Sequence, residues 1–288
     1  MISIIIIVKN DRRIADTLRA LRDIEKPETT EVIVVDASKG LLDDIKKKYN
    51  YARWISFEKK TIKKTTIPDQ RNVGIKNAKG DIIAFIDSDC IPHKKWLVEL
   101  TNPIRKEKEN IVAGRVKLND EKNIHNIEHE KLLTQKYINE CPTMNVAINK
   151  SLYKSIGNYD ESFRFGSDVD FSWRAIKAGY KIRFNPKAVI SHDLGDSKNE
   201  IRRMYDYGKA RTTLYMKHRD RMRIFWGNEF MTTLFPISLL LLPLTIIFPY
   251  YPLIFMYPIL KHRNIKLIIM KTMYGTGVLK EFLFPDQP

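Results

Sequence analysis

The chain has 288 residues, which is enough for one large domain or for one domain with an appendage. Its net charge of +16 indicates an anionic partner such as nucleic acid, a membrane surface or a phosphorylated substrate. The two cysteines lack paired spacing, which argues against a disulfide scaffold and favours a reducing compartment.

Strands and helices alternate through the first half of the chain. The apolar start, residues 2–8, lacks the basic leader of a signal peptide and predicts a buried strand. Further apolar runs predict strands at residues 32–35, 52–57 and 82–86, and apolar residues at helical spacing predict helices at residues 12–22, 41–49 and 69–78. This alternation predicts an α/β fold with a mainly parallel, doubly wound sheet, in which ligands bind at the carboxyl ends of the strands.

The predicted strand at residues 82–86 is followed by two carboxylates. Asp87 and Asp89 are two residues apart, so both side chains project the same way from extended backbone. Two carboxylates aimed at one point repel unless a cation lies between them, and oxygen ligands of this kind suit Mg²⁺ or Mn²⁺. The alternative is that the pair only ends the strand in an Asx turn.

Several motifs surround this pair in a fixed order. They are Arg71–Ile75, Ala78–Asp81, Phe85–Asp89 and Trp96–Leu97. Together they resemble the nucleotide-sugar glycosyltransferases of family 2, and the likeness extends from residue 3 to about residue 192. The resemblance implies the Rossmann-like GT-A fold, a nucleoside-diphosphate sugar donor (UDP- or GDP-linked) and a Mn²⁺ or Mg²⁺ cofactor. It also implies that Asp89 binds this metal and that Asp87 supports the metal or the ribose.

The resemblance implies a set of nucleotide contacts as well. Asp36 matches the family position whose carboxylate contacts the base or the ribose, and Lys9 and Asn10 stand where the family usually has Tyr-Asn. Asp69 and Arg71 match residues that line the nucleotide pocket. Structural roles remain open for three of them. Asp36 can precede a helix or form a turn, and Asp69 and Arg71 can be a first-turn carboxylate and a solvated side chain.

A later segment, residues 142–149, predicts a strand with one polar face. Thr143 and Asn145 alternate with apolar neighbours, and the segment resembles a family strand that ends in a basic residue, here Lys150. The alternation predicts either that both polar side chains line the sugar pocket or that they form a structural polar face.

Asp168 is the candidate general base. Family 2 members usually carry Glu-Asp-x-Asp followed by an Arg, and this chain has Ser167 to Asp170 followed by Arg174. The resemblance implies that Asp168 takes the proton of the acceptor hydroxyl as that hydroxyl attacks the anomeric carbon with inversion. It also places Asp170 and Arg174 in the substrate site. Ser167 and Asp170 have the spacing of a capping box, which would leave Asp168 free to face the cleft.

Three histidines are candidate metal ligands. His192 ends a predicted strand at residues 189–192 and matches a family histidine that coordinates the metal or touches the diphosphate. Neutral imidazole suits Mn²⁺ better than Mg²⁺. His125 and His129 lie four residues apart, a spacing that can clasp zinc on one helix face, but no third ligand is evident and a solvated helix is favoured.

The last third of the chain has a different character. Residues 201–223 combine basic side chains with tyrosines, a pattern typical of a nucleic-acid groove or of an anionic membrane surface. Residues 230–260 contain no charged side chain but are interrupted by five prolines, so they predict a single membrane span, an interfacial hairpin or a core hairpin. Residues 265–284 predict an amphipathic interfacial helix. Basic residues flank both ends of the apolar segment, which favours a membrane-associated chain with a cytoplasmic catalytic domain and no nucleic-acid partner.

These patterns predict a catalytic domain in residues 1–200, a basic juxtamembrane helix in residues 201–229 and a membrane-associated region in residues 230–288. The expected activity is inverting transfer of one sugar from the donor to a membrane-proximal glycan or lipid-linked acceptor. The Gln-x-x-Arg-Trp signature of processive synthases is missing, which favours single addition. Two alternatives remain. Nucleotidyl transfer to a sugar phosphate would need a Gly-rich, Lys-bearing loop after the first strand. A non-catalytic basic membrane-binding module would need no donor.

Overall fold

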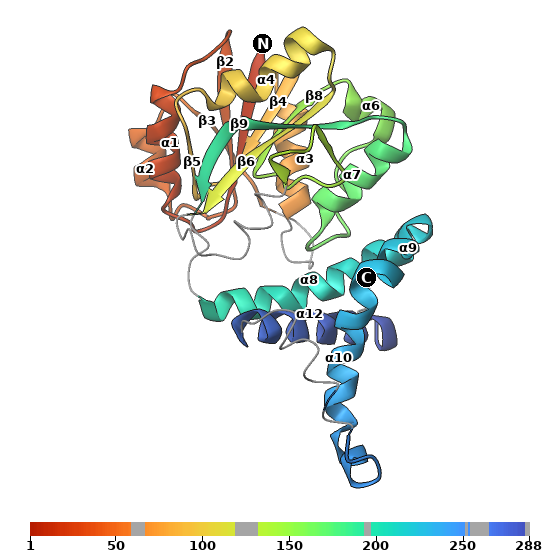
Figure 1. Cartoon of the computed structure of the whole chain (residues 1–288). Helices are drawn as coiled ribbons and strands as arrows, with labels where there is room; N and C mark the ends of the chain where they lie inside the picture. The colour runs from red at the N-terminus through yellow and green to blue at the C-terminus, as the bar shows by residue number, and fades with distance from the viewer. Residues whose placement is uncertain (59–66, 119–131, 193–196, 251–252, 254–264, 286–288) are drawn as a thin grey trace. The chain divides into compact units, whose positions relative to one another are not determined.

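The computed structural model of the chain describes residues 1–58, 67–118, 132–192, 197–250, 253 and 265–285. The chain divides into two compact units, Met1–Asp193 and Leu194–Pro288. The first unit is built around a sheet and the second consists of helices (Figure 1).

The described part of the first unit contains a nine-stranded sheet, with strand order β3-β2-β1-β4-β8-β6-β9-β5 and with β7 beside β9. The strands are β1 Ile2–Val8, β2 Thr30–Asp36, β3 Arg53–Ser56, β4 Ile82–Ile86, β5 Cys90–Pro92, β6 Ile111–Leu118, β7 Tyr137–Ile138, β8 Asn145–Asn149 and β9 Ile182–His192. The helices are α1 Ile14–Asp23, α2 Asp43–Lys48, α3 Ile67–Asn77, α4 Trp96–Glu107, α6 Leu152–Ile156 and α7 Ser167–Lys177.

The direction of the strands decides which ends meet. β3, β2, β1 and β4 pair in parallel, as the alternation of strands and helices predicts. β8 is antiparallel to β4, and β6 is antiparallel to β8, so β6 again runs in the direction of β4. β9 is parallel to β6 and therefore ends at the same edge as β4. The α/β fold is confirmed, with a parallel half and a mixed half. The edge at which β1, β2, β4 and β9 end is called the carboxyl edge.

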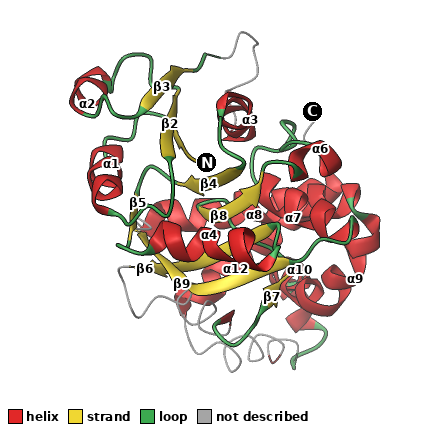
Figure 2. Cartoon of the chain, turned by 90° about the horizontal axis from the view of Figure 1, so that it is seen from above, coloured by secondary structure: helices red, strands yellow, loops and turns green. Residues whose placement is uncertain are grey.

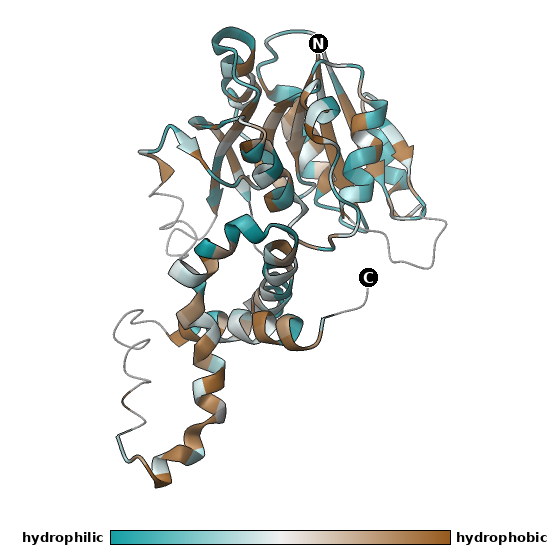
Figure 3. Cartoon of the chain, turned by 90° about the vertical axis from the view of Figure 1, so that its right-hand side faces the viewer, coloured by the Kyte–Doolittle hydropathy of each residue, from teal (hydrophilic) through white to brown (hydrophobic). Residues whose placement is uncertain are grey.

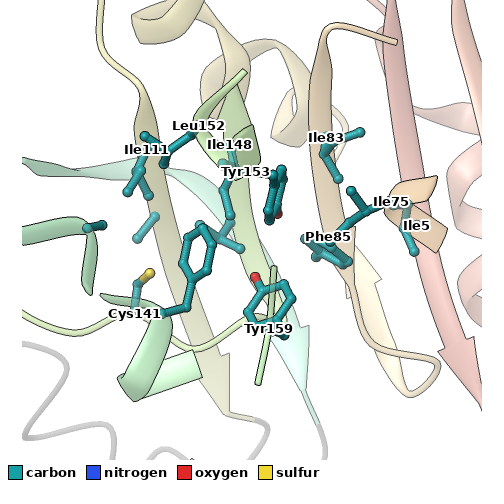
Figure 4. Packing of buried hydrophobic residues seen from close by; sticks show 14 of the residues in the cluster. Ile5, Ile75, Ile83, Phe85, Ile111, Cys141, Ile148, Leu152, Tyr153 and Tyr159 are labelled. Carbon is teal, nitrogen blue, oxygen red and sulfur yellow. The ribbon is translucent and has the colours of Figure 1, made fainter. Parts of the chain in front are cut away.

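Helices cover both faces of this sheet, which explains the continuous apolar strands. α1 and α2 lie on one side of the parallel strands and α3 lies on the other (Figure 2). Successive side chains of a strand point to opposite faces, so Ile5, Ile83 and Phe85 share one face and pack with residues of α3, α6 and α7 (Figure 4). Burial of each such side chain is worth about 1.5–3 kcal/mol.

An aromatic cluster joins the central strand to the segment before α7. The ring centroid of Phe85 in β4 is 5.9 Å from that of Tyr159, and Tyr159 is 4.8 Å from Phe171 in α7. Aromatic pairs at these separations add specific geometry to the hydrophobic burial. The cluster therefore holds the first turns of α7 in place against β4.

The described part of the second unit contains three long helices and several short helical segments. They are α8 Ser197–Lys217, η1 Arg219–Arg221, α9 Met222–Ile224, η2 Phe225–Glu229, α10 Phe230–Leu240, η3 Leu242–Ile246 and α12 Ile265–Leu283. α12 covers nearly the whole helix predicted at residues 265–284. Among the helices that the structure describes, none combines the length and apolar character needed to cross a membrane. The predicted apolar segment 230–260 is described only to residue 250 and at residue 253.

Glycines allow α8, α10 and α12 to approach closely. A methyl group at Gly277 would overlap the carbonyl oxygen of Tyr205 in α8, and one at Gly275 would overlap that of Thr232 in α10. A partly buried polar network links α8 and α12 to Glu229, the last residue of η2. Glu229 accepts hydrogen bonds from the Tyr215 hydroxyl at 2.8 Å and from the Tyr274 hydroxyl at 2.7 Å. These contacts tie the helices of the unit to one another.

We predict that Gly277→Ala lowers the free energy of unfolding of the helical unit by about 1–3 kcal/mol, because the added methyl group forces the backbones apart. Gly227→Ala is the matched control, since nothing lies within 4 Å of a Cβ at that helical position. It should leave stability unchanged or raise it by up to about 1 kcal/mol. Urea unfolding followed by helical circular dichroism compares the two variants. Equal stability would contradict the close packing of α8 and α12.

Candidate active site

The short strand β5 places Asp89 beside His192. β5 is antiparallel to the end of β9, with Cys90 opposite His192. The preceding Asp89 consequently lies with its Oδ2 at 3.3 Å from His192 Nε2. The Thr17 hydroxyl of α1 donates a hydrogen bond of 2.8 Å to the Ser88 carbonyl and fixes this loop from the other side.

The donor set fits a divalent cation. Ligand atoms of Asp89, Cys90 and His192 all lie within 4.8 Å of one another. The Nε2 atom of His192 faces Asp89, so it is the nitrogen that could share an ion with this carboxylate, whereas the buried Nδ1 has no hydrogen-bond partner among the described residues. Burial, together with the charges of Asp87 and Asp89, raises the pKa of the Cys90 thiol, which makes the carboxylate and the imidazole the better ligands for Mn²⁺. His125 and His129 lie outside the described residues.

Asp87 stands in the middle of a group of charges. Burial raises its pKa, the carboxylates of Asp89 and Asp168 raise it further, and the charges of Arg71 and His192 oppose this shift. For Asp89 burial acts in the same direction, but the hydrogen bond and charge of His192 and the charge of Arg13 outweigh it and lower the pKa. The site therefore gathers acidic groups in a poorly solvated place and favours a bound cation.

Asp168 lies at the second residue of α7 and is partly exposed. The predicted capping box is wrong, because Gly166 is the N-cap residue and no side chain caps the helix. Gly166 adopts φ +82°, a backbone conformation that suits glycine. Ser167 is already inside the helix, where its hydroxyl accepts a hydrogen bond from Arg71 Nη1 at 3.4 Å. Asp168 still has no capping role in the first turn beyond accepting the Val169 N–H at 2.9 Å.

Asp170 and Arg174 have structural contacts where substrate contacts were expected. Asp170 is 0% exposed and forms an ion pair of 2.9 Å with Arg174. The guanidinium also donates to the carbonyls of Ile156 and Asn158, the latter at 2.8 Å. The pair thus anchors the loop before α7, and full burial of the carboxylate excludes contact with a substrate in this conformation. We assign both side chains a positioning role.

Asn145 likewise differs from the expectation that it lines the sugar pocket. It is 0% exposed, accepts a hydrogen bond of 2.8 Å from Trp96 Nε1, and donates to the carbonyls of Arg115 and Ala188 at 2.9 and 3.0 Å. These contacts join α4, β6, β8 and β9 and use the whole side-chain amide. These contacts favour the structural alternative for Asn145. Thr143 is also buried.

The loops after β1 and β2 are joined at the carboxyl edge. Asp36 Oδ1 accepts the Ser38 N–H at 2.8 Å, so one oxygen of this carboxylate makes an Asx turn. Ser38 in turn accepts the Asn10 N–H at 2.7 Å, and Asn10 adopts φ +58°. Lys9 and Asn10 are exposed, whereas Asp36 is nearly buried. These residues surround the ends of the parallel strands, where donors bind in folds of this kind.

The first turns of α3 connect the two sides of the site. Asp69 and Arg71 are both buried. Arg71 contacts Ser167 and lies over the Tyr159 ring, with 5.6 Å from its guanidinium carbon to the ring centroid. Gln70, between them, has a role that the sequence did not reveal. Its amide nitrogen donates to the carbonyls of Val8 and Val35 at 3.1 Å each and bridges the ends of β1 and β2.

A cavity of about 840 Å³ lies away from this group, beside α3 and α6. Its lining includes Asp81, which precedes β4, and Lys150, which follows β8. Both residues lie at the amino end of β4, opposite Asp87. The carboxyl edge is the better candidate for the active site, because it combines the acidic pair, the histidine and Asp168.

A Rossmann-like sheet whose central strand ends in Asp-x-Asp, with a histidine and a third carboxylate nearby, defines the class of GT-A glycosyltransferases. Residues 3–170 match the family described as Glycosyl transferase family 2, and the chain belongs to this family.

Three relatives illustrate the breadth of the likeness. The chain is 28% identical over 165 residues to "Pre-mycofactocin glycosyltransferase" of Mycobacterium tuberculosis, which covers 52% of this chain and 35% of that protein. It is 25% identical over 162 residues to "Glycosyltransferase AglE" of Haloferax volcanii, which covers 53% of each. It is also 25% identical over 194 residues to a Methanococcus voltae protein, with coverage of 61% and 58%. That protein is named "Dolichyl N-acetyl-alpha-D-glucosaminyl phosphate 3-beta-D-2,3-diacetamido-2,3-dideoxy-beta-D-glucuronosyltransferase". The matches thus span from about a third to just over half of the length of these relatives.

Solved structures show the same fold. The crystal structure of GalNAc-T7 with UDP, GalNAc and Mn²⁺ superposes with a TM-score of 0.56 at 16% identity, covering 67% of this chain and 44% of the other. At this identity the likeness shows the fold alone.

We predict that Asn145→Ala lowers the free energy of unfolding by about 2–4 kcal/mol, because it leaves the Trp96 N–H and two carbonyls without their partner. Asn158→Ala is the control, since that side chain is exposed, and it should change stability by less than about 0.5 kcal/mol. Thermal unfolding of both variants measures the difference. If Asn145→Ala kept wild-type stability but bound the donor more weakly, Asn145 would instead be assigned to the sugar pocket.

Proposed function

We propose that the chain transfers one sugar, with inversion, from a UDP- or GDP-linked donor to a glycan or lipid-linked acceptor. The observation that carries this proposal is the convergence of Asp87, Asp89 and His192 with Asp168 at the carboxyl edge. Family membership supports glycosyl transfer over nucleotidyl transfer, and β1 is followed by Lys9-Asn10 where a nucleotidyltransferase would need a Gly-rich loop.

Asp89 and His192 would hold the divalent ion, and Asp87 would support either the ion or the ribose. A bound Mn²⁺ or Mg²⁺ supplies positive charge that stabilises the leaving diphosphate. The imidazole of His192, whose Nε2 faces Asp89, favours Mn²⁺. The GalNAc-T7 structure with UDP and Mn²⁺ supports the same pairing of nucleotide and ion for this fold.

Asp168 would act as the base. The acceptor hydroxyl must lose a proton as it attacks the anomeric carbon, and a carboxylate within hydrogen-bond reach accepts that proton. Asp168 is partly exposed and lies close enough to Asp87 to influence its pKa, which supports a place for it beside the donor. The Arg71–Ser167 contact and the aromatic cluster would keep it there.

The nucleotide would lie over the ends of β1 and β2. We assign the base or ribose contact to the second oxygen of Asp36, with Lys9 and Asn10 at the rim and Asp69 and Arg71 along the wall. The name of the M. voltae relative includes a dolichyl phosphate-linked sugar, which supports a lipid-linked acceptor here.

We predict that Asp168→Asn lowers the rate of donor hydrolysis by about 10²–10⁴-fold, since the general base is lost, while calorimetry shows unchanged binding of UDP or GDP with Mn²⁺. The substrates are a panel of UDP- and GDP-sugars, with release of the nucleotide as the readout. Asp23→Asn, an exposed carboxylate in α1, is the control and should keep wild-type activity. Equal rates in the two variants would remove Asp168 from the mechanism.

The second unit would attach the enzyme to an anionic membrane surface. The segment that follows α10 is strongly apolar (Figure 3), yet Ile246 is 88% and Tyr250 79% exposed. Ile247 and Phe248 are exposed with them. Contiguous exposed apolar side chains of this size mark an interaction surface. Arg219, Arg221 and Arg223 precede the segment, and basic residues beside an apolar one favour anionic lipid.

We predict that the triple change Ile246→Ser, Ile247→Ser, Phe248→Ser lowers co-sedimentation with phosphatidylglycerol-containing vesicles by at least about tenfold, because the inserted apolar area is lost. The three side chains are exposed, so the fold should tolerate the change. Leu41→Ser, at an exposed leucine of the first unit, is the control and should bind vesicles as the wild type does. Retained binding by the triple variant would contradict this attachment.

A further inference from the structure

Arg13 links the loop after β1 to the acidic pair after β4. It precedes the first residue of α1, and its Nη2 lies 2.8 Å from Asp11 Oδ2 and 3.2 Å from Asp89 Oδ2. Its Nε also donates to Asp11 Oδ1 at 3.0 Å. One guanidinium thus bridges two carboxylates. Arg13 is half exposed at 51%, whereas the Asp89 side chain is only 19% exposed.

The contact with Asp89 competes with a metal ion. Arg13 approaches Asp89 through Oδ2, the same oxygen that faces His192 Nε2. A divalent cation held by Asp89 and His192 would place a second positive charge within a few ångströms of the guanidinium. Like charges at that separation repel, so the ion and Arg13 cannot both keep a full interaction with this oxygen.

We propose that Arg13 is the counter-ion of Asp89 before a metal ion binds. When the ion binds to Asp89, Arg13 releases this carboxylate and then binds the diphosphate of the donor. The inference rests on the proposed function. Asp11 binds the Nε and Nη2 atoms of the guanidinium, so Arg13 stays at the mouth of the site when the contact of Nη2 with Asp89 weakens. A diphosphate offers oxygens in the paired geometry that a guanidinium recognises, and an arginine is better suited to this than a lysine.

This exchange has opposite effects on two binding steps. Arg13 opposes the binding of Mn²⁺ alone, because the ion must displace it. Arg13 favours the binding of a nucleoside diphosphate once Mn²⁺ is present. Mn²⁺ and the nucleoside diphosphate therefore increase each other's affinity more in the wild type than in a chain without Arg13. This coupling is measured by binding alone and needs no turnover.

The test measures the affinity for Mn²⁺ by electron paramagnetic resonance, and the affinity for UDP and for GDP at saturating Mn²⁺ by calorimetry. Arg13→Gln should bind Mn²⁺ alone about two- to fivefold more tightly, the range of a half-exposed ion pair. The same variant should bind the preferred nucleotide about tenfold more weakly. Arg13→Lys keeps the charge, so it should bind Mn²⁺ alone as the wild type does and bind the nucleotide with intermediate affinity.

Arg12→Gln is the matched control. Arg12 is adjacent in sequence and carries the same charge, but it pairs with the exposed Asp44. Its loss should change neither affinity more than about twofold, because exposed charges in water interact weakly. Circular dichroism and the melting temperature verify that all three variants fold.

Unchanged or weaker binding of Mn²⁺ by Arg13→Gln would overturn the inference while leaving the metal site in place. An equal effect of Arg12→Gln would also overturn it, because general charge and not the Asp89 contact would then be the cause. If the wild type bound neither Mn²⁺ nor a nucleotide with Mn²⁺, both the inference and the proposed function would fail together.

Discussion

The site depends on the repulsion between acidic side chains that the fold forces together at the poorly solvated end of a strand. Burial and the negative charges of Asp89 and Asp168 raise the pKa of Asp87, while the charges of Arg71 and His192 oppose this shift. A cation close to such a carboxylate stabilises its ionised form. The negative charge of Asp89 attracts the guanidinium of Arg13. The same charge makes the site suitable for a divalent ion and, through that ion, for a diphosphate.

Sheet topology brings these groups together from distant parts of the sequence. Two successive antiparallel pairings, β4 with β8 and β8 with β6, restore the original direction, so β9 ends at the same edge as β4. The three residues of β5 then turn back along β9 and set the register that places Asp89 against His192. Gln70 ties the ends of β1 and β2, and Arg71 ties α3 to the start of α7. These hydrogen bonds link the ends of β1 and β2 to α3, and α3 to the start of α7.

Periodicity predicted the parts of the fold that local sequence determines. The strands at β1, β2 and β4 and the helices α1 and α3 lie within a few residues of their predicted positions, because buried parallel strands and amphipathic helices have strong patterns. β5 could not be predicted, since three residues ending in a proline acquire strand geometry only from a partner about 100 residues away. The capping box at Ser167 failed because the preceding glycine took the cap position and Ser167 found Arg71 as its partner.

Polar residues were harder to assign than apolar ones. An asparagine on the polar face of a strand has the same local pattern whether it meets a sugar or, as Asn145 does, a tryptophan and two carbonyls. Asp170 and Arg174 have the spacing of a family motif, but their role as an anchor for the loop before α7 follows from contacts with residues 156 and 158. The contact of Arg13 with Asp89 joins residues 76 positions apart and left no local signal.

The most direct measurement is a crystal structure of the chain with UDP or GDP and Mn²⁺, in which the anomalous signal of manganese locates the ion. We expect the ion between Asp89 and His192, with the diphosphate over the ends of β1 and β4 and with Asp168 facing the sugar side of the nucleotide. An ion or diphosphate bound instead in the cavity beside α3 and α6, lined by Lys76, Lys150 and Lys154, would contradict it.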